Sequence, residues 1–234
     1  MEHGPHGSGA RNLASGGVRG SVVQAGSIQH LSLNAQGGRA VPVVPRQLPL
    51  AVLDFTGRAE QLAYLDGLLD HEPCPPGDAG TVVISAVDGA GGVGKTTLAV
   101  HWARRVEHRF PDGTLFANLR GYGPGIPLRP GEVLVGFLLA LGVPAEAIPA
   151  GVEARAGLYR SVLAGVSEPV LVIADNASSE AQVRPLLPGM GPHRVVVTSR
   201  HTLGGLDARL LDVTVLDDAA GGTTGGGAAG RLPG

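Results

Sequence analysis

The stretch Gly89-Ala90-Gly91-Gly92-Val93-Gly94-Lys95-Thr96 has the form G-x-x-x-x-G-K-[S/T] of a phosphate-binding loop, or P-loop. Its glycines let the backbone turn so that N–H groups converge on phosphate oxygens, and the positive end of the following helix adds to this attraction. Lys95 is the only lysine in the chain, since 17 of the 18 basic residues are arginine. Chance is therefore a poor explanation for a lysine at this position.

The sequence on either side of the loop has the order that a P-loop requires. Residues 81–87 are a β-branched, apolar run that predicts a buried strand. Downstream, apolar residues recur at helical spacing on one face: Leu98, Ala99, Trp102, Ala103 and Val106. We expect Lys95 to reach the β- and γ-phosphates and the Thr96 hydroxyl to bind Mg²⁺. The other residues expected around the nucleotide phosphates are Gly89, Gly91, Gly92, Val93, Gly94 and Thr97.

Two further strands end in polar residues that suit a nucleotide site. The apolar run at 170–174 ends in Asp175, the pattern of a Walker B carboxylate that helps to hold Mg²⁺. The next residue is Asn176, where many P-loop ATPases have an acid that activates water, and an amide cannot accept that proton. The run at 195–197 leads to Arg200, which would face the γ-phosphate if its strand lies between the other two. The alternative is an ordinary arginine after an inner strand.

The remaining pattern predicts an α/β fold of the P-loop NTPase class, of the ASCE or AAA-like type. Helices are expected at about 59–70, 131–141, 153–164 and 179–187, and further strands at 113–119, 169–174, 194–198 and 210–216. Alternating strands and helices favour a mainly parallel sheet, here of about five strands, with helices on both faces.

We expect three parts along the chain. Residues 1–48 are a Gly-, Ser- and Gln-rich leader that forms either a small β element or a disordered segment, and prolines mark a linker at 42–49. Residues 49–216 are the nucleotide-binding domain. Residues 217–234 are a Gly- and Ala-rich tail that we expect to be flexible. If ordered, the leader is a candidate for self-association or for binding a partner through its strand edges.

Composition limits the classes of function. The net charge of −2 and a pI near 6.4 provide no broad basic field, so neither nucleic acid nor a membrane is expected as a partner. Cys74 is the only cysteine, and the start of the chain does not resemble a signal peptide, which favours the cytoplasm. The eight histidines show no metal-ligand spacing.

Several motifs together resemble the NB-ARC ATPases of the STAND signalling class, and most closely the actinobacterial members. The resemblance covers about residues 45–216 and rests on the run Phe55–Glu60, the P-loop, Asp175 and the run Thr198–Arg200, with Arg46–Pro49, Phe110–Gly113 and Leu119–Tyr122 as further landmarks. It implies that Gly57 and Arg58 lie against an adenine and that Arg200 is a sensor arginine. It also implies a chain truncated after the nucleotide-binding core, because the lid and winged helix of complete members do not follow.

The function implied is that of an adenine-nucleotide-binding module, taking ADP or ATP with Mg²⁺, from a regulatory or defence switch. In this interpretation Lys95, Asp175 and Arg200 are the residues with a catalytic role, and hydrolysis is weak or absent. Two alternatives stay open. One is a slow P-loop ATPase, and the other is an assembly protein in which the nucleotide site is vestigial. The sequence shows no recognition helix or basic stripe that would support a transcription-factor role.

Overall fold

The computed structural model describes residues 43–52, 55–70, 81–86, 92–189 and 191–214, and a parallel sheet lies at their centre. The strands are β1 (Thr81–Ala86), β2 (Thr114–Asn118), β3 (Leu171–Ala177), β4 (Arg194–Ser199) and β5 (Arg209–Val213). They lie in the order β2-β3-β4-β1-β5, and every neighbouring pair is parallel. The predicted α/β fold with about five parallel strands is therefore confirmed.

The helices are close to those that the apolar spacing predicts. They are α1 (Ala59–Asp70), α2 (Lys95–Val106), α3 (Pro130–Ala140), α4 (Val152–Ala164) and α5 (Glu180–Val183). Local chemistry sets some ends. Pro130 occupies the first turn of α3, where no N–H is needed, and Glu132 accepts a hydrogen bond from the Arg129 N–H at 3.3 Å. The helix expected at 179–187 is α5 followed by a 3₁₀ turn (Arg184–Leu186), because Pro185 cannot continue an α-helix.

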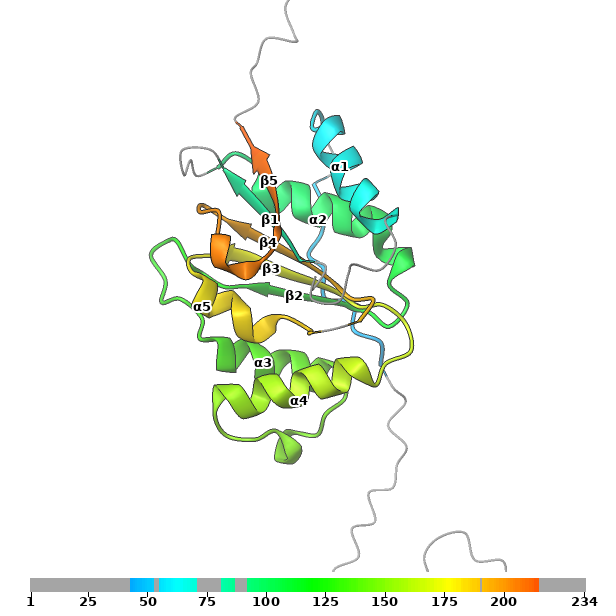
Figure 1. The fold of residues 1–234 in the computed structure, drawn as a ribbon, viewed down its shortest axis with the longest axis vertical. Coiled ribbons are helices and arrows are strands. Elements are labelled where there is room, and N and C mark those ends of the chain that lie inside the picture. The colour runs from blue at the N-terminus through cyan, green and yellow to red at the C-terminus, as the bar shows by residue number, and fades with distance from the viewer. Residues whose placement is uncertain (1–42, 53–54, 71–80, 87–91, 190, 215–234) are drawn as a thin grey trace, which may run out of the picture. The chain divides into compact units, whose positions relative to one another are not determined.

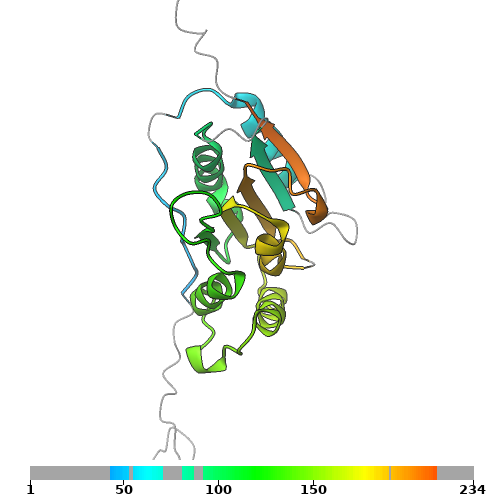
Figure 2. The same ribbon diagram turned by 90° about the vertical axis from the view of Figure 1, so that its left-hand side faces the viewer.

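Alternate strand residues pack on opposite faces of the sheet, as the two-residue period of a strand requires. Ile84, Ile173 and Val196 join a core with α1 and α2. Val83, Val172 and Val195 join a second core with α3, α4 and α5. The result is a layer of helices on each side of the sheet (Figures 1 and 2). Almost every one of these strand residues is fully buried, which explains why the strands read as continuous apolar runs.

β4 lies between β1 and β3, the position that brings Arg200 close to the P-loop helix. Because the strands are parallel, the carboxyl ends of β1, β3 and β4 lie at the same edge of the sheet. The start of α2, Asp175 and Arg200 are therefore brought together from three segments that span about a hundred residues of the sequence. The strand that leads to Arg200 does lie between the other two, which is the condition under which Arg200 would face the γ-phosphate.

The segment Pro45–Leu48, which the sequence predicted as part of a linker, packs against the domain. The Thr114 N–H donates to the Pro45 carbonyl at 2.8 Å, and the Gln47 N–H donates to the Thr114 carbonyl at 3.0 Å. The Arg46 guanidinium donates to the carbonyls of Phe110 and Pro111, and the Leu48 side chain is only 5% exposed. The prolines thus hold an extended segment that partly covers the edge of β2. The linker interpretation failed because these contacts join residues more than sixty positions apart.

The chain divides into two compact units, Met1–Val41 and Pro42–Gly234, and all described residues belong to the second. Residues 1–42 of the predicted leader, Cys74, Gly89, Gly91 and the tail at 217–234 lie outside the described residues.

Candidate functional site

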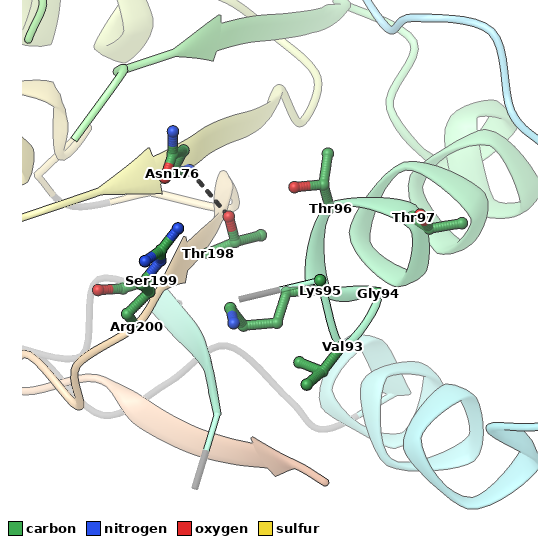
Figure 3. A pocket seen from close by; sticks show the side chains of 10 residues that line it. Val93, Gly94, Lys95, Thr96, Thr97, Asn176, Thr198, Ser199 and Arg200 are labelled. Atoms are coloured by element: carbon green, nitrogen blue, oxygen red, sulfur yellow. Dashed lines mark hydrogen bonds between the residues drawn. The ribbon is translucent and has the colours of Figure 1, made fainter. Parts of the chain in front are cut away.

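A cavity of about 230 Å³ lies where the start of α2 meets the ends of β3 and β4 (Figure 3). The first part of its lining is the P-loop end, namely Gly92, Val93, Gly94, Lys95, Thr96 and Thr97. The second part is Asn176 from β3 together with Thr198, Ser199 and Arg200 at the end of β4. In open parallel sheets this edge is where ligands bind. Of the residues expected around the phosphates, Lys95, Thr96 and Thr97 line this cavity together with Gly92, Val93 and Gly94.

The turn into α2 depends on two glycines. Gly92 and Gly94 have φ angles of 81° and 86°, in the left-handed region that side chains disfavour. Gly94 is the N-cap of α2, and its carbonyl accepts the first helical hydrogen bond, from the Leu98 N–H at 2.8 Å. The positive end of the α2 dipole is therefore at the cavity, next to Lys95. This arrangement attracts anions, and phosphate above all.

Asp175, at the end of β3, is only 3% exposed and lies behind the residues that line the cavity. The hydroxyls of Thr96 and Thr198 both donate to its Oδ1 atom, each at 2.6 Å. A Thr hydroxyl and a carboxylate oxygen side by side are the kind of oxygen ligands that Mg²⁺ prefers, usually one or two from the protein and the rest from water and phosphate. Thr96 and Asp175 thus fit the predicted metal position. Sequence reasoning did not predict the bond from Thr198.

Asn176 has an unusual backbone conformation, with φ of 58°, which asparagine tolerates better than most residues. Its N–H donates to the Thr198 hydroxyl at 2.9 Å, the bond drawn in Figure 3. Its side-chain amide donates to the Tyr122 carbonyl at 3.0 Å. Asn176 lines the cavity beside the Mg²⁺-type oxygens, but an amide cannot serve there as a general base.

Two cations enter the cavity from opposite sides, Lys95 from α2 and Arg200 from the end of β4 (Figure 3). Burial lowers the pKa of Lys95, the positive charge of Arg200 lowers it further, and the negative charge of Asp175 opposes both effects. The ammonium and guanidinium groups are thus close enough to repel each other. An anion between them would relieve this repulsion.

Gly57 and Arg58 lie beside the P-loop but do not line this cavity. Both residues have positive φ angles, 77° and 64°, at the turn that leads into α1. The Arg58 guanidinium is 7% exposed and donates to the Val93 carbonyl at 2.9 Å, and burial lowers its pKa. Arg58 therefore joins the start of α1 to the P-loop, a contact that the sequence alone did not indicate.

The Arg120 side chain, which the sequence left as a surface arginine, is exposed and belongs to a different depression. That hollow, of about 490 Å³, lies between β2 and α3 and includes Phe116 and Phe137. Sequence reasoning also missed Tyr122, whose ring lies under the Arg200 guanidinium at 4.6 Å. The loop between β2 and α3 carries no periodic signal that would have indicated this contact.

Within the described part of the chain, no three or more His, Cys, Asp or Glu side chains come together as a metal-binding group. Over the same residues, none of the helices is long and apolar enough to cross a membrane.

The sheet order and the loop at the start of α2 are those of the P-loop NTPase fold, and the site occupies the phosphate-binding end of that fold. No family model matches the chain. The chain is 47% identical over 173 residues to the regulatory protein AfsR of Streptomyces coelicolor and 44% identical to that of Streptomyces griseus. Each match covers 74% of this chain but only 17% of the relative.

Solved structures with a similar fold are more distant in sequence. The ORC2 protein of Aeropyrum pernix, solved as ADPNP–ADP complexes, is 19% identical, with a TM-score of 0.45. The match covers 71% of this chain and 49% of the ORC2 chain. A STAND protein with a tetratricopeptide repeat sensor from Pyrococcus horikoshii is 18% identical, with a TM-score of 0.44. The match covers 73% of this chain and 24% of the Pyrococcus chain.

Proposed function

We propose that this chain is an adenine-nucleotide-binding module of NB-ARC type, from a regulatory switch of the STAND class. The observation that carries the proposal is the meeting of Lys95, Thr96 and Arg200 around one cavity at the positive end of α2, with the buried Asp175 accepting a hydrogen bond from Thr96. The similarity to AfsR, a regulatory protein, supports a regulatory role. Because the chain spans 17% of that relative, the activity of the whole protein is part of the proposal.

Each part of a nucleotide has a matching group in this proposal. Lys95 and the backbone of Gly89–Gly94 hold the phosphates, and Arg200 stands near the terminal one. Thr96 and Asp175 hold Mg²⁺, which supplies positive charge against the phosphates when it is bound. Gly57 and Arg58 lie against the adenine, as the NB-ARC resemblance implies. Arg58 would then link the base to the phosphates, because its guanidinium already bonds to Val93 in the P-loop.

Thermal unfolding with and without ADP and Mg²⁺ tests the proposal. A ligand at 100 to 1,000 times its Kd stabilises the folded state by about 3–4 kcal/mol, which raises the Tm by several degrees. Lys95→Ala should lose this shift. Arg160→Ala, which removes an exposed positive charge from α4 on the other face of the sheet, should keep it. An unchanged Tm in the natural chain, or an equal shift in Lys95→Ala, would refute nucleotide binding at this site.

We further propose that binding predominates over hydrolysis. Asn176 occupies the place beside Asp175 where a general base would act, and its amide is engaged with the Tyr122 carbonyl. Phosphate release from ATP should therefore not exceed that of the Lys95→Ala variant. A higher rate in the natural chain would favour the slow ATPase.

The three-part organisation of leader, domain and tail also remains a proposal. Because Pro45–Leu48 packs against β2, the proposed leader ends before Pro45, and the domain continues to 216 with the tail at 217–234. A location of the protein in the cytoplasm is likewise a proposal. We propose that the leader contributes self-association or partner binding.

A further inference from the structure

The Arg200 guanidinium is stacked on an aromatic ring. Its Cζ atom lies 4.6 Å from the centre of the Tyr122 ring. A guanidinium over a tyrosine face is attracted by the negative charge of the ring's π-system. The same ring makes an edge contact with His201 at a centroid distance of 5.7 Å, so Tyr122 contacts two successive residues after β4.

Tyr122 itself is held by the end of β3. The Gly121 N–H donates to the Asn176 carbonyl at 2.7 Å, and the Asn176 side-chain amide donates to the Tyr122 carbonyl at 3.0 Å. The two segments are so close that a Cβ atom on Gly121 would lie 2.5 Å from the Asn176 carbonyl oxygen and from the Ser178 nitrogen. The backbone that carries the ring is therefore fixed to the residue after Asp175.

This support acts against a repulsion in the cavity. Lys95 and Arg200 line the same cavity, so their two positive charges repel each other when no anion lies between them. An arginine side chain that is repelled by the lysine and free to rotate would leave the cavity for solvent. The stacked ring holds the guanidinium beside Lys95 before any ligand arrives. A group positioned in advance loses less conformational entropy on binding.

We propose that Tyr122 is a positioning residue that keeps Arg200 in the phosphate cavity and thereby favours nucleoside triphosphate over diphosphate. The inference rests on the proposed nucleotide site and adds a determinant of its specificity. The positive charges of Lys95, the α2 N-terminus and Mg²⁺ balance the negative charge of a diphosphate. A third phosphate adds further negative charge that lies farthest from the base, and Arg200 is the cation at the far wall of the cavity. Losing its support should therefore weaken triphosphate binding selectively.

The test compares the affinities of the full chain for ATP and ADP, each with Mg²⁺, by titration calorimetry. Tyr122→Leu removes the π-face, and we expect ATP affinity to fall about 3- to 30-fold while ADP affinity changes less than about twofold. Tyr122→Phe should keep both affinities, because the Tyr122 hydroxyl is buried without a hydrogen-bond partner among the described residues. Tyr122→Met, which has similar bulk and no ring, replaces the leucine variant if that protein fails to fold.

A second arm removes the supported group. Arg200→Gln should weaken ATP binding as Tyr122→Leu does, and the double variant should lose little more, because both changes remove the same interaction. Equal losses for ATP and ADP in Tyr122→Leu would show a merely structural role and overturn the inference. So would unchanged ATP affinity, or a loss in Tyr122→Phe equal to that in Tyr122→Leu. If the natural chain binds neither nucleotide, the proposed function itself fails, which is a separate result.

Discussion

At the residue scale, Asp175 is the buried carboxylate that accepts hydrogen bonds from both Thr96 and Thr198. Asp175→Ala would leave the buried Thr198 hydroxyl without its acceptor, which should lower the free energy of unfolding by about 1–3 kcal/mol. It would also remove the carboxylate that we expect to hold Mg²⁺. Urea unfolding measures the first effect, and ADP affinity with Mg²⁺ or with a chelator measures the second.

The matched control for Asp175 is Glu146→Ala, which removes an exposed carboxylate from the turn between α3 and α4. It should leave both the stability and the effect of Mg²⁺ unchanged. Persistence of the Mg²⁺ effect in Asp175→Ala would mean that the ion is held elsewhere.

His193 provides a prediction about pH. Its Nδ1 accepts the Val170 N–H at 3.2 Å and its Nε2 lies 3.2 Å from the Leu163 carbonyl, so the neutral ring with a proton on Nε2 satisfies both partners. Burial lowers the pKa of His193 and nearby Arg194 adds to this, while the Leu163 carbonyl and Asp112 oppose it. The folded state thus takes up this proton at lower pH than the unfolded state, whose histidine pKa is about 6.5. The contribution to stability is complete above that pH and is lost as the pH falls below it.

Urea unfolding at pH 7.5 and 5.5 should show this loss, and His193→Gln should reduce the difference between the two pH values. A difference of the same size in His193→Gln would assign the pH dependence to other groups.

At the scale of elements, the spacing of apolar residues within a segment predicted the helices and strands that form from contacts inside that segment. Helix α1 was expected at 59–70 and has those bounds, because its leucine spacing and flanking turns are contained in the segment itself. The inner strands β1, β3 and β4 were found for the same reason, as buried runs bounded by glycine, proline or polar residues. By contrast, the contacts of Pro45–Leu48 with β2 and of Tyr122 with Arg200 join residues 60 to 80 positions apart. The residue pattern within Pro45–Leu48, or within the loop that carries Tyr122, does not indicate which distant residues that segment contacts.

The contact between the loop after β2 and the end of β3 can be tested with a pair of glycines. Gly121→Ala would place a methyl group 2.5 Å from two backbone atoms, which cannot move aside as a flexible side chain can. We expect a loss of about 1–3 kcal/mol in unfolding free energy, the usual cost of overpacking. Gly125→Ala, in the same loop, would meet no atom closer than 3.9 Å and should be nearly neutral. Equal stability of the two variants in urea would show that this loop is not held against β3.

At the scale of the whole molecule, two truncations separate the leader from the folded domain. Removing residues 1–42 should leave the Tm of the domain unchanged, since Pro45–Leu48 and their contacts remain. Removing residues 1–49 also deletes Leu48, whose burial contributes about 1.5–3 kcal/mol, and the Arg46 bonds, so the Tm should fall. Differential scanning calorimetry measures both. Equal Tm values would mean that Pro45–Leu48 adds nothing to stability. Light scattering on the shorter truncation tests self-association through the leader.

The strand order has a consequence for how the protein is made. β1 lies between β4 and β5, yet its nearest partner in the sequence begins about 110 residues later, so a ribosome working at 5–20 residues per second needs about 5–20 s to supply it. During that time a strand rich in valine and isoleucine, which later leads into the phosphate loop, has both edges open. Nascent chains of this protein therefore expose an aggregation-prone segment until β4 and β5 have been made, and chaperones that bind extended apolar peptides are suited to shield it.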